Sequence, residues 1–69
     1  MKVMYDPTAD IVSMILSSAS VAESDEVRPG VILDFDQEGR VVAIEILDAS
    51  RRMDAPDAMR FEISAETTR

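Results

Sequence analysis

The chain has 69 residues, enough for one domain at most, and it contains neither cysteine nor histidine. These absences exclude disulfide bonds, thiolate metal sites and the Ser-His and Cys-His nucleophile pairs within one chain. Fourteen acidic residues against seven basic ones give a formal net charge of −7, which argues against a nucleic-acid partner. An acidic surface suits solubility or docking onto a basic protein.

The sequence shows no signal for a membrane. No apolar run approaches the roughly 20 residues that cross a bilayer, and the first residues do not resemble an export signal. Lys2 is followed by a short apolar stretch that already ends at Asp6. We therefore expect a cytoplasmic protein with no membrane partner, forming a single small domain over residues 1–69 with a frayed tail at residues 65–69.

The first half of the chain predicts three short strands. Residues 2–5 predict a strand. Asp6-Pro7 marks the break after it, since proline also disfavours a helix at the residue before it. Residues 11–17, IVSMILS, are rich in β-branched and apolar side chains. Residues 21–27, VAESDEV, predict a weaker strand at a sheet edge, where carboxylates resist pairing with other chains.

The second half predicts two clearer strands and a short helical element. Pro29-Gly30 marks a turn, and residues 31–36 and 41–47 then alternate on either side of the turn QEGR. After Leu47 the strand pattern stops.

The C-terminal part is less regular. Asp54 is a plausible helix N-cap with Pro56 in the first turn, although residues 51–59 could also be exchanged between copies. Residues 60–64, RFEIS, predict a last strand. The predicted fold class is mainly β, a small α+β protein: an antiparallel meander of five to six short strands with one short helical turn near the C-terminus. Connections this short allow only neighbouring hairpins.

The stretch DFDQEGRVVAIE, residues 34–45, has two interpretations. It matches the pattern of an EF-hand calcium loop at five positions, namely Asp34, Asp36, Glu38, Gly39 and Glu45, with glutamate at the third acidic position as the one departure. An EF-hand needs a helix on each side, whereas both flanks here alternate with a period of two. We therefore predict a hairpin turn, closed by Gly39 in the left-handed conformation.

Other carboxylates fall close together in sequence. Asp6 and Asp10 bracket one turn, and Glu23, Asp25 and Glu26 crowd another segment. Paired carboxylates can perform acid–base chemistry or hold magnesium, but a solvated loop explains these spacings equally well. We therefore predict no catalytic, cofactor-binding or metal-ligating residue and no cofactor.

The strands are apolar on both sides. One predicted face is a small core made of Val3, Tyr5, Val12, Met14, Leu16, Val31, Leu33, Phe35, Val42, Ile44 and Ile46. The opposite face mixes Met4, Ile11, Ile15, Ile32, Val41, Ala43 and Leu47 with Ser13, Asp34 and Glu45. A sheet face that meets water is normally polar, so we expect the C-terminal segment to cover part of this second face and another protein the rest.

Two stretches, MYDPTADIVSMILS and DEVRPGVILDFDQEGRVVAIEILDAS, resemble a family of small microbial proteins known as domain of unknown function 2283. The matching positions are Tyr5-Asp6, Ala9-Asp10 and residues 27–31, 34–36, 39–42 and 44–50. Ser13 and Ile15 replace larger aromatic and basic residues of the pattern, and nothing after Met53 matches. The resemblance implies a fold but no reaction, substrate or catalytic residue. By analogy it also suggests a partner role in toxin–antitoxin pairs.

Three function classes remain after these observations. The leading one is a non-enzymatic, acidic interaction module that forms a homo-oligomer, with a dimer favoured, or acts as the antitoxin-like partner of a small basic protein. The alternative is a divalent-metal or small-ligand protein that uses Asp34, Asp36 and Glu38, or Asp6 and Asp10. Catalysis comes third, since it would depend on carboxylates, Tyr5 or Lys2 alone.

Overall fold

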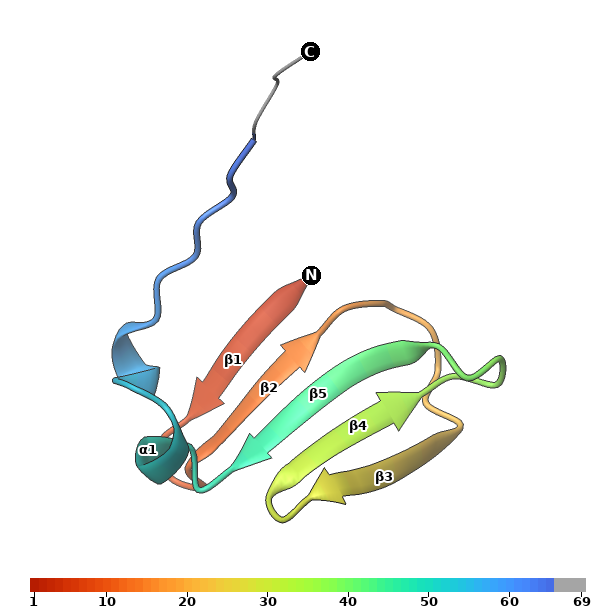
Figure 1. Ribbon diagram of the computed structural model, residues 1–69, viewed down its shortest axis with the longest axis horizontal. Coiled ribbons are helices and arrows are strands. Elements are labelled where there is room, and N and C mark those ends of the chain that lie inside the picture. The colour runs from red at the N-terminus through yellow and green to blue at the C-terminus, as the bar shows by residue number, and fades with distance from the viewer. Residues whose placement is uncertain (66–69) are drawn as a thin grey trace.

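The computed structural model describes residues 1–65 as a single antiparallel β-sheet followed by two short helical turns (Figure 1). The strands are β1 (Lys2–Asp6), β2 (Ile11–Ile15), β3 (Glu23–Arg28), β4 (Val31–Phe35) and β5 (Val41–Leu47). The α-helical turn α1 (Ala49–Arg52) and the 3-10 turn η1 (Pro56–Ala58) complete the fold. The mainly-β antiparallel class is therefore confirmed, with five strands.

The strand order is β1-β2-β5-β4-β3, which differs from a simple meander at one connection. The seven residues 16–22 between Ile15 and Glu23 pass the ends of β5 and β4 and place β3 at the far edge. Three strand spacings amount to about 14 Å, which seven extended residues span easily. Along the way the amide of Leu16 donates to the Val42 carbonyl at 2.8 Å, and that of Ala22 donates to the Phe35 carbonyl at 2.7 Å. The predicted edge position of β3 is confirmed.

The pairing of the strands divides their side chains between two faces. The inner face carries Val3, Tyr5, Val12, Met14, Val31, Leu33, Phe35, Val41, Ile44 and Ile46. The outer face carries Lys2, Met4, Asp6, Ile11, Ser13, Ile15, Ser24, Glu26, Ile32, Asp34, Ala43, Glu45 and Leu47. The expected place of Val41 on the outer face is wrong, because a register shift between Asp34 and Phe35 pairs Val41 with Phe35.

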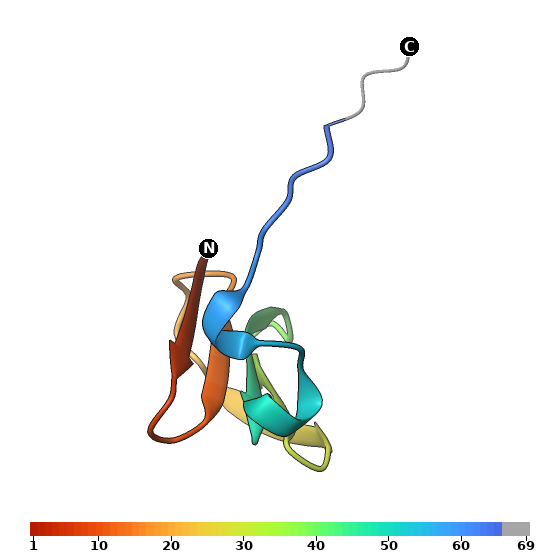
Figure 2. The ribbon, with the colours of Figure 1, turned by 90° about the vertical axis from the view of Figure 1, so that its left-hand side faces the viewer.

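The C-terminal segment lies over β1 and β2 on the inner face, so the expectation that it covers part of the outer face is wrong. Met53, Met59 and Phe61 line a hollow together with inner-face side chains of β1 and β2, and Val12 beneath them is fully buried. Figure 2 shows α1 and the following chain on one side of the sheet. Asp48, in the left-handed conformation at φ 51°, directs the chain onto this side.

Two predictions for the C-terminal region are also wrong. Asp54 caps no helix: Ala55 precedes η1, in which Pro56 is the first residue. The expected strand at residues 60–64 does not form, because this extended segment has no neighbouring strand and leaves Ile63 95% exposed (Figure 1). Alternation alone predicts a strand, but a strand exists only with a hydrogen-bonding partner. Most of the predicted frayed tail lies outside the described residues.

Candidate functional site

The outer face is the part of the fold that carries unusual chemistry. Six of its thirteen strand residues are apolar, and Met4 on the edge strand is 41% exposed. Asp34, near the middle of the sheet, is 95% buried, with only 5% of its surface exposed. A buried carboxylate among apolar neighbours is costly unless it has hydrogen-bonding partners.

Asp34 has two polar partners from neighbouring strands. The Ser24 hydroxyl on β3 donates to its Oδ1 at 2.5 Å. On the other side Glu45 of β5 lies diagonally across the ladder, since Asp34 pairs with Ala43 and Glu45 with Ile32. The hydrogen bond with Asp34, burial and the charge of Asp34 together raise the pKa of Glu45. The two side chains thus form a carboxyl pair on adjacent strands.

A shallow hollow of about 290 Å³ lies over this carboxyl pair. Its lining consists of Met4, Ser13, Ile15, Ser17, Ala19, Val21, Asp34, Val42, Ala43 and Glu45. Residues 17–21 belong to the connection that crosses from β2 to β3, so this connection forms one wall. The hollow is mainly apolar apart from the hydroxyls of Ser13 and Ser17 and the two carboxyls.

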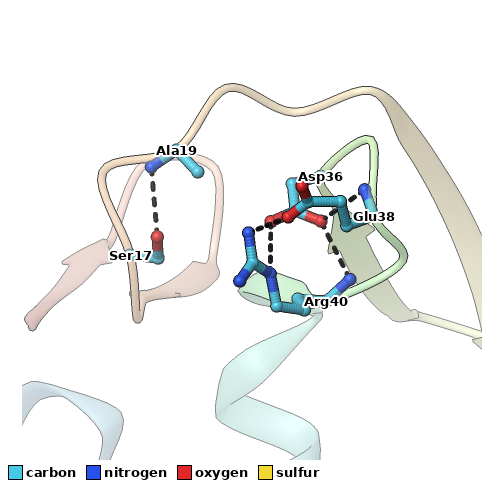
Figure 3. A network of polar contacts seen from close by, with 5 residues as sticks. All are labelled: Ser17, Ala19, Asp36, Glu38 and Arg40. Carbon is cyan, nitrogen blue, oxygen red and sulfur yellow. Dashed lines mark hydrogen bonds and ion pairs between the residues drawn. The ribbon is translucent and has the colours of Figure 1, made fainter.

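The β4–β5 hairpin shows what happens to the calcium-like stretch (Figure 3). Asp36 accepts hydrogen bonds from the amides of Glu38 and Arg40, both at 2.9 Å, and from the Arg40 guanidinium at 3.1 Å. These bonds, chiefly that from the Arg40 amide, lower the pKa of Asp36. Gly39 takes the left-handed conformation at φ 80°. The predicted hairpin turn is confirmed.

The acidic residues of that stretch do not converge. Asp36 faces its own turn, Glu38 pairs with Arg40, and Glu45 lies in the middle of β5. Within residues 1–65 no three acidic side chains come close enough to hold a metal ion.

The β1–β2 turn separates Asp6 from Asp10 in the same way. The Asp6 carboxylate accepts the amides of Thr8 at 3.0 Å and Ala9 at 3.2 Å, and so shapes the turn. Glu23, Asp25 and Glu26 are all exposed on edge strand β3. Neither group brings its carboxylates together around a common centre.

Asp10 instead joins the N-terminal hairpin to α1. Its carboxylate accepts the Tyr5 hydroxyl at 2.8 Å, the Ser50 amide at 3.0 Å and the Ser50 hydroxyl at 2.7 Å. The Ser50 hydroxyl contributes most to the lowered pKa of Asp10, and the bond to Asp10 raises the pKa of Tyr5. We call these three residues the Asp10 clamp. It is a structural contact, and it fixes where the C-terminal segment begins.

The fold and this surface define a class: a small single-sheet antiparallel β protein whose C-terminal segment lies over two strands of one face. The comparisons place it further. Residues 2–50 match the family model described as Protein of unknown function (DUF2283), and the chain belongs to this family. No curated protein and no solved structure matched it. Among the described residues, no helix has the length and apolar character needed to cross a membrane.

The structure gives several family positions a physical role. Tyr5, Asp10 and Ser50 form the Asp10 clamp, and Asp36 with Gly39 closes the β4–β5 turn. The resemblance therefore rests largely on residues that build the fold. The Asp34–Glu45 pair was not predicted from the sequence, because its formation depends on the exact pairing of β4 with β5.

Proposed function

We propose that the protein is a non-enzymatic interaction module that self-associates as a dimer, with a second copy covering the outer face. The uncovered outer face is the observation that carries the proposal. Among the described residues, the only buried apolar side chains are Val12, Val42, Ala43, Ala49 and Pro56. A chain this small without disulfides commonly gains the rest of its core by association.

The C-terminal segment supports a partner on the outer face specifically. Because it already lies on the inner face, it leaves the apolar residues of the outer face uncovered. Packing two such faces about 10 Å apart would produce a β-sandwich, in which each sheet buries the other. The family has no assigned function, so the proposal depends on this surface alone.

Light scattering at micromolar concentration tests self-association directly. We expect a mass twice the 7.6 kDa of one chain. Met4→Asp should shift the mass to that of one chain, because it puts a carboxylate into an apolar contact with the second copy. Ile63→Asp is the matched control: Ile63 is 95% exposed and lies outside the outer face, so the dimer should persist. A mass of 7.6 kDa for the unmodified chain would refute the proposal.

The charge of −7 supports a second candidate, a basic protein partner. The exposed carboxylates of β3, Glu23, Asp25 and Glu26, give it an acidic edge for such a partner. Tagged co-purification with the products of neighbouring genes tests it. Repeated recovery of the chain with only copies of itself would favour the dimer.

A further inference from the structure

The pairing of the strands arranges the outer face in rows. One row runs Lys2, Ile15, Ala43, Asp34 across β1, β2, β5 and β4. The next row runs Met4, Ser13, Glu45, Ile32 across the same four strands. Each row therefore has a fixed order of charge and size, which a second copy must complement.

Two symmetric ways of stacking this face on itself exist when the strands stay aligned. A twofold axis along the strands, between β2 and β5, places β1 over the partner's β4 and β2 over the partner's β5. Each row then faces itself in reverse. A twofold axis across the strands instead places every strand over its own counterpart.

The axis along the strands gives complementary contacts in both rows. In the first row Lys2 faces the partner's Asp34, and Ile15 faces the partner's small Ala43. In the second row Met4 faces the partner's Ile32, and Ser13 faces the partner's Glu45. Opposite charges, large against small, and hydroxyl against carboxyl all coincide without any adjustable choice beyond the position of the axis.

The axis across the strands gives a worse match at the centre. If that axis passes through the second row, Glu45 faces Glu45 of the partner subunit with an Asp34 beside each of them, and desolvation and repulsion both oppose four buried carboxyls. If it passes through the first row, Lys2 and Asp34 each face their own counterparts. If it passes between the rows, Lys2 faces the partner's Met4 and Asp34 faces the partner's Ile32, which leaves both charges against apolar side chains.

We infer that the dimer is a face-to-face sandwich with its twofold axis along the strands, in which Lys2 of each copy completes the other copy's Asp34–Glu45 pair. This inference rests on the proposed function, because it specifies how the proposed dimer is built. The hollow over Asp34 and Glu45 has no lysine or arginine in its lining, and Lys2 of the second copy brings an ammonium to it. Each site is thus incomplete in a single chain.

Disulfide formation tests the orientation, since the natural chain has no cysteine. In the double variant Met4→Cys/Ile32→Cys the two thiols of one chain are separated by three strand spacings, about 14 Å, beyond the reach of a disulfide. Oxidation can therefore join them only between copies, and inter-sheet disulfides of this kind occur in immunoglobulin domains. We expect a covalent dimer from the double variant and none from either single variant.

The single variants distinguish the two axes. Rapid crosslinking of Met4→Cys alone would mean that Met4 faces Met4 of the partner subunit, which overturns the inference in favour of the axis across the strands. A dimeric mass without crosslinking in the double variant would also overturn it, while the proposed dimer would stand. A monomeric mass for the unmodified chain would remove the proposed function itself.

A charge reversal tests the role of Lys2 without a thiol. Lys2→Glu should raise the dissociation constant of the dimer about 10-fold, because it replaces the cation with a third carboxylate. The same reversal should have little effect in an Asp34→Asn/Glu45→Gln background, where the opposing pair is neutral. Arg60→Glu changes the net charge equally but lies outside the outer face, and it should leave the dimer unchanged. Equal weakening by Lys2→Glu and Arg60→Glu would show general repulsion, and the assigned contact would be wrong.

Discussion

Asp10→Ala is expected to lower the melting temperature by about 10 °C, a large effect for one half-buried turn residue. The change removes three hydrogen bonds at once, those from the Tyr5 hydroxyl and from the amide and hydroxyl of Ser50. It also places alanine at φ 58°, a conformation that aspartate tolerates better. Thermal unfolding followed by circular dichroism measures the loss, at one fixed protein concentration because association contributes to stability.

The loss of stability at low pH tests the same contact in a second way. The pKa of Asp10 is lowered in the folded chain, so its contribution is present above the ordinary value near 3.8 and is lost as pH falls through the lowered value. Acidification from about pH 5 should therefore destabilise the unmodified chain more than Asp10→Ala.

Two further variants serve as controls for this result. Asp10→Asn keeps an acceptor oxygen and tolerates the left-handed conformation, so its melting temperature should fall between the other two. Asp25→Ala makes the same chemical change on exposed strand β3 and should shift the melting temperature by no more than about 2 °C. If Asp10→Ala melts with the unmodified chain, the Asp10 clamp does not hold α1 in place.

The positions of the strands follow from local patterns, which is why the sequence predicts them well. Alternation marks residues 31–35 and 41–47, and Pro29-Gly30 and Gly39 mark the turns between strands. The helical turn at residues 49–52 gives no such signal: it starts from the left-handed Asp48 and is held by Asp10, forty residues away. Contacts of that kind depend on the assembled fold.

The strand order and the Asp34–Glu45 pair also depend on contacts that form only in the assembled fold, so the sequence does not predict them. The expectation that every short connection joins neighbouring strands is wrong for residues 16–22, because seven extended residues also reach the far edge of the sheet. The Asp34–Glu45 pair exists only because β4 and β5 pair in one particular register. A shift of one residue would move Glu45 to the inner face. The alternation along the strands correctly indicates that both faces carry apolar residues. Only the folded structure shows over which face the C-terminal segment lies.

Glu45→Gln should strengthen the dimer at neutral pH, contrary to the usual effect of changing a partly buried charged residue. The pKa of Glu45 is raised above its ordinary 4.5, so the folded chain favours the protonated carboxyl. That contribution is complete below pH 4.5 and is lost as pH rises through the raised value. Above this raised value a second negative charge stands beside Asp34 on the face that the second copy would cover, so self-association of the unmodified chain should weaken as pH rises through it.

Glutamine fixes the favourable state at every pH. Its amide can donate to Asp34 as the protonated carboxyl does, and it leaves one negative charge for Lys2 of the partner subunit. We expect the dissociation constant at about pH 8 to fall roughly 10-fold and its dependence on pH to flatten. Association is measured between about pH 5 and pH 8, where Asp10 and Asp36 do not titrate because the pKa values of both are lowered from 3.8.

The groups around Glu45 define the control. Asp34 on β4 is its acidic partner, Ser13 on β2 is uncharged, and Glu26 on β3 lies beyond Ile32 and accepts the Gly30 amide at 2.8 Å. Glu38→Gln removes the same charge from the exposed β4–β5 turn, so it reports how far lower net charge alone strengthens the dimer. Dilution series followed by sedimentation at several pH values measure all three chains. If the Glu45→Gln dimer dissociates more readily than the unmodified dimer at pH 8, the interface requires an ionised Glu45 and the prediction is wrong.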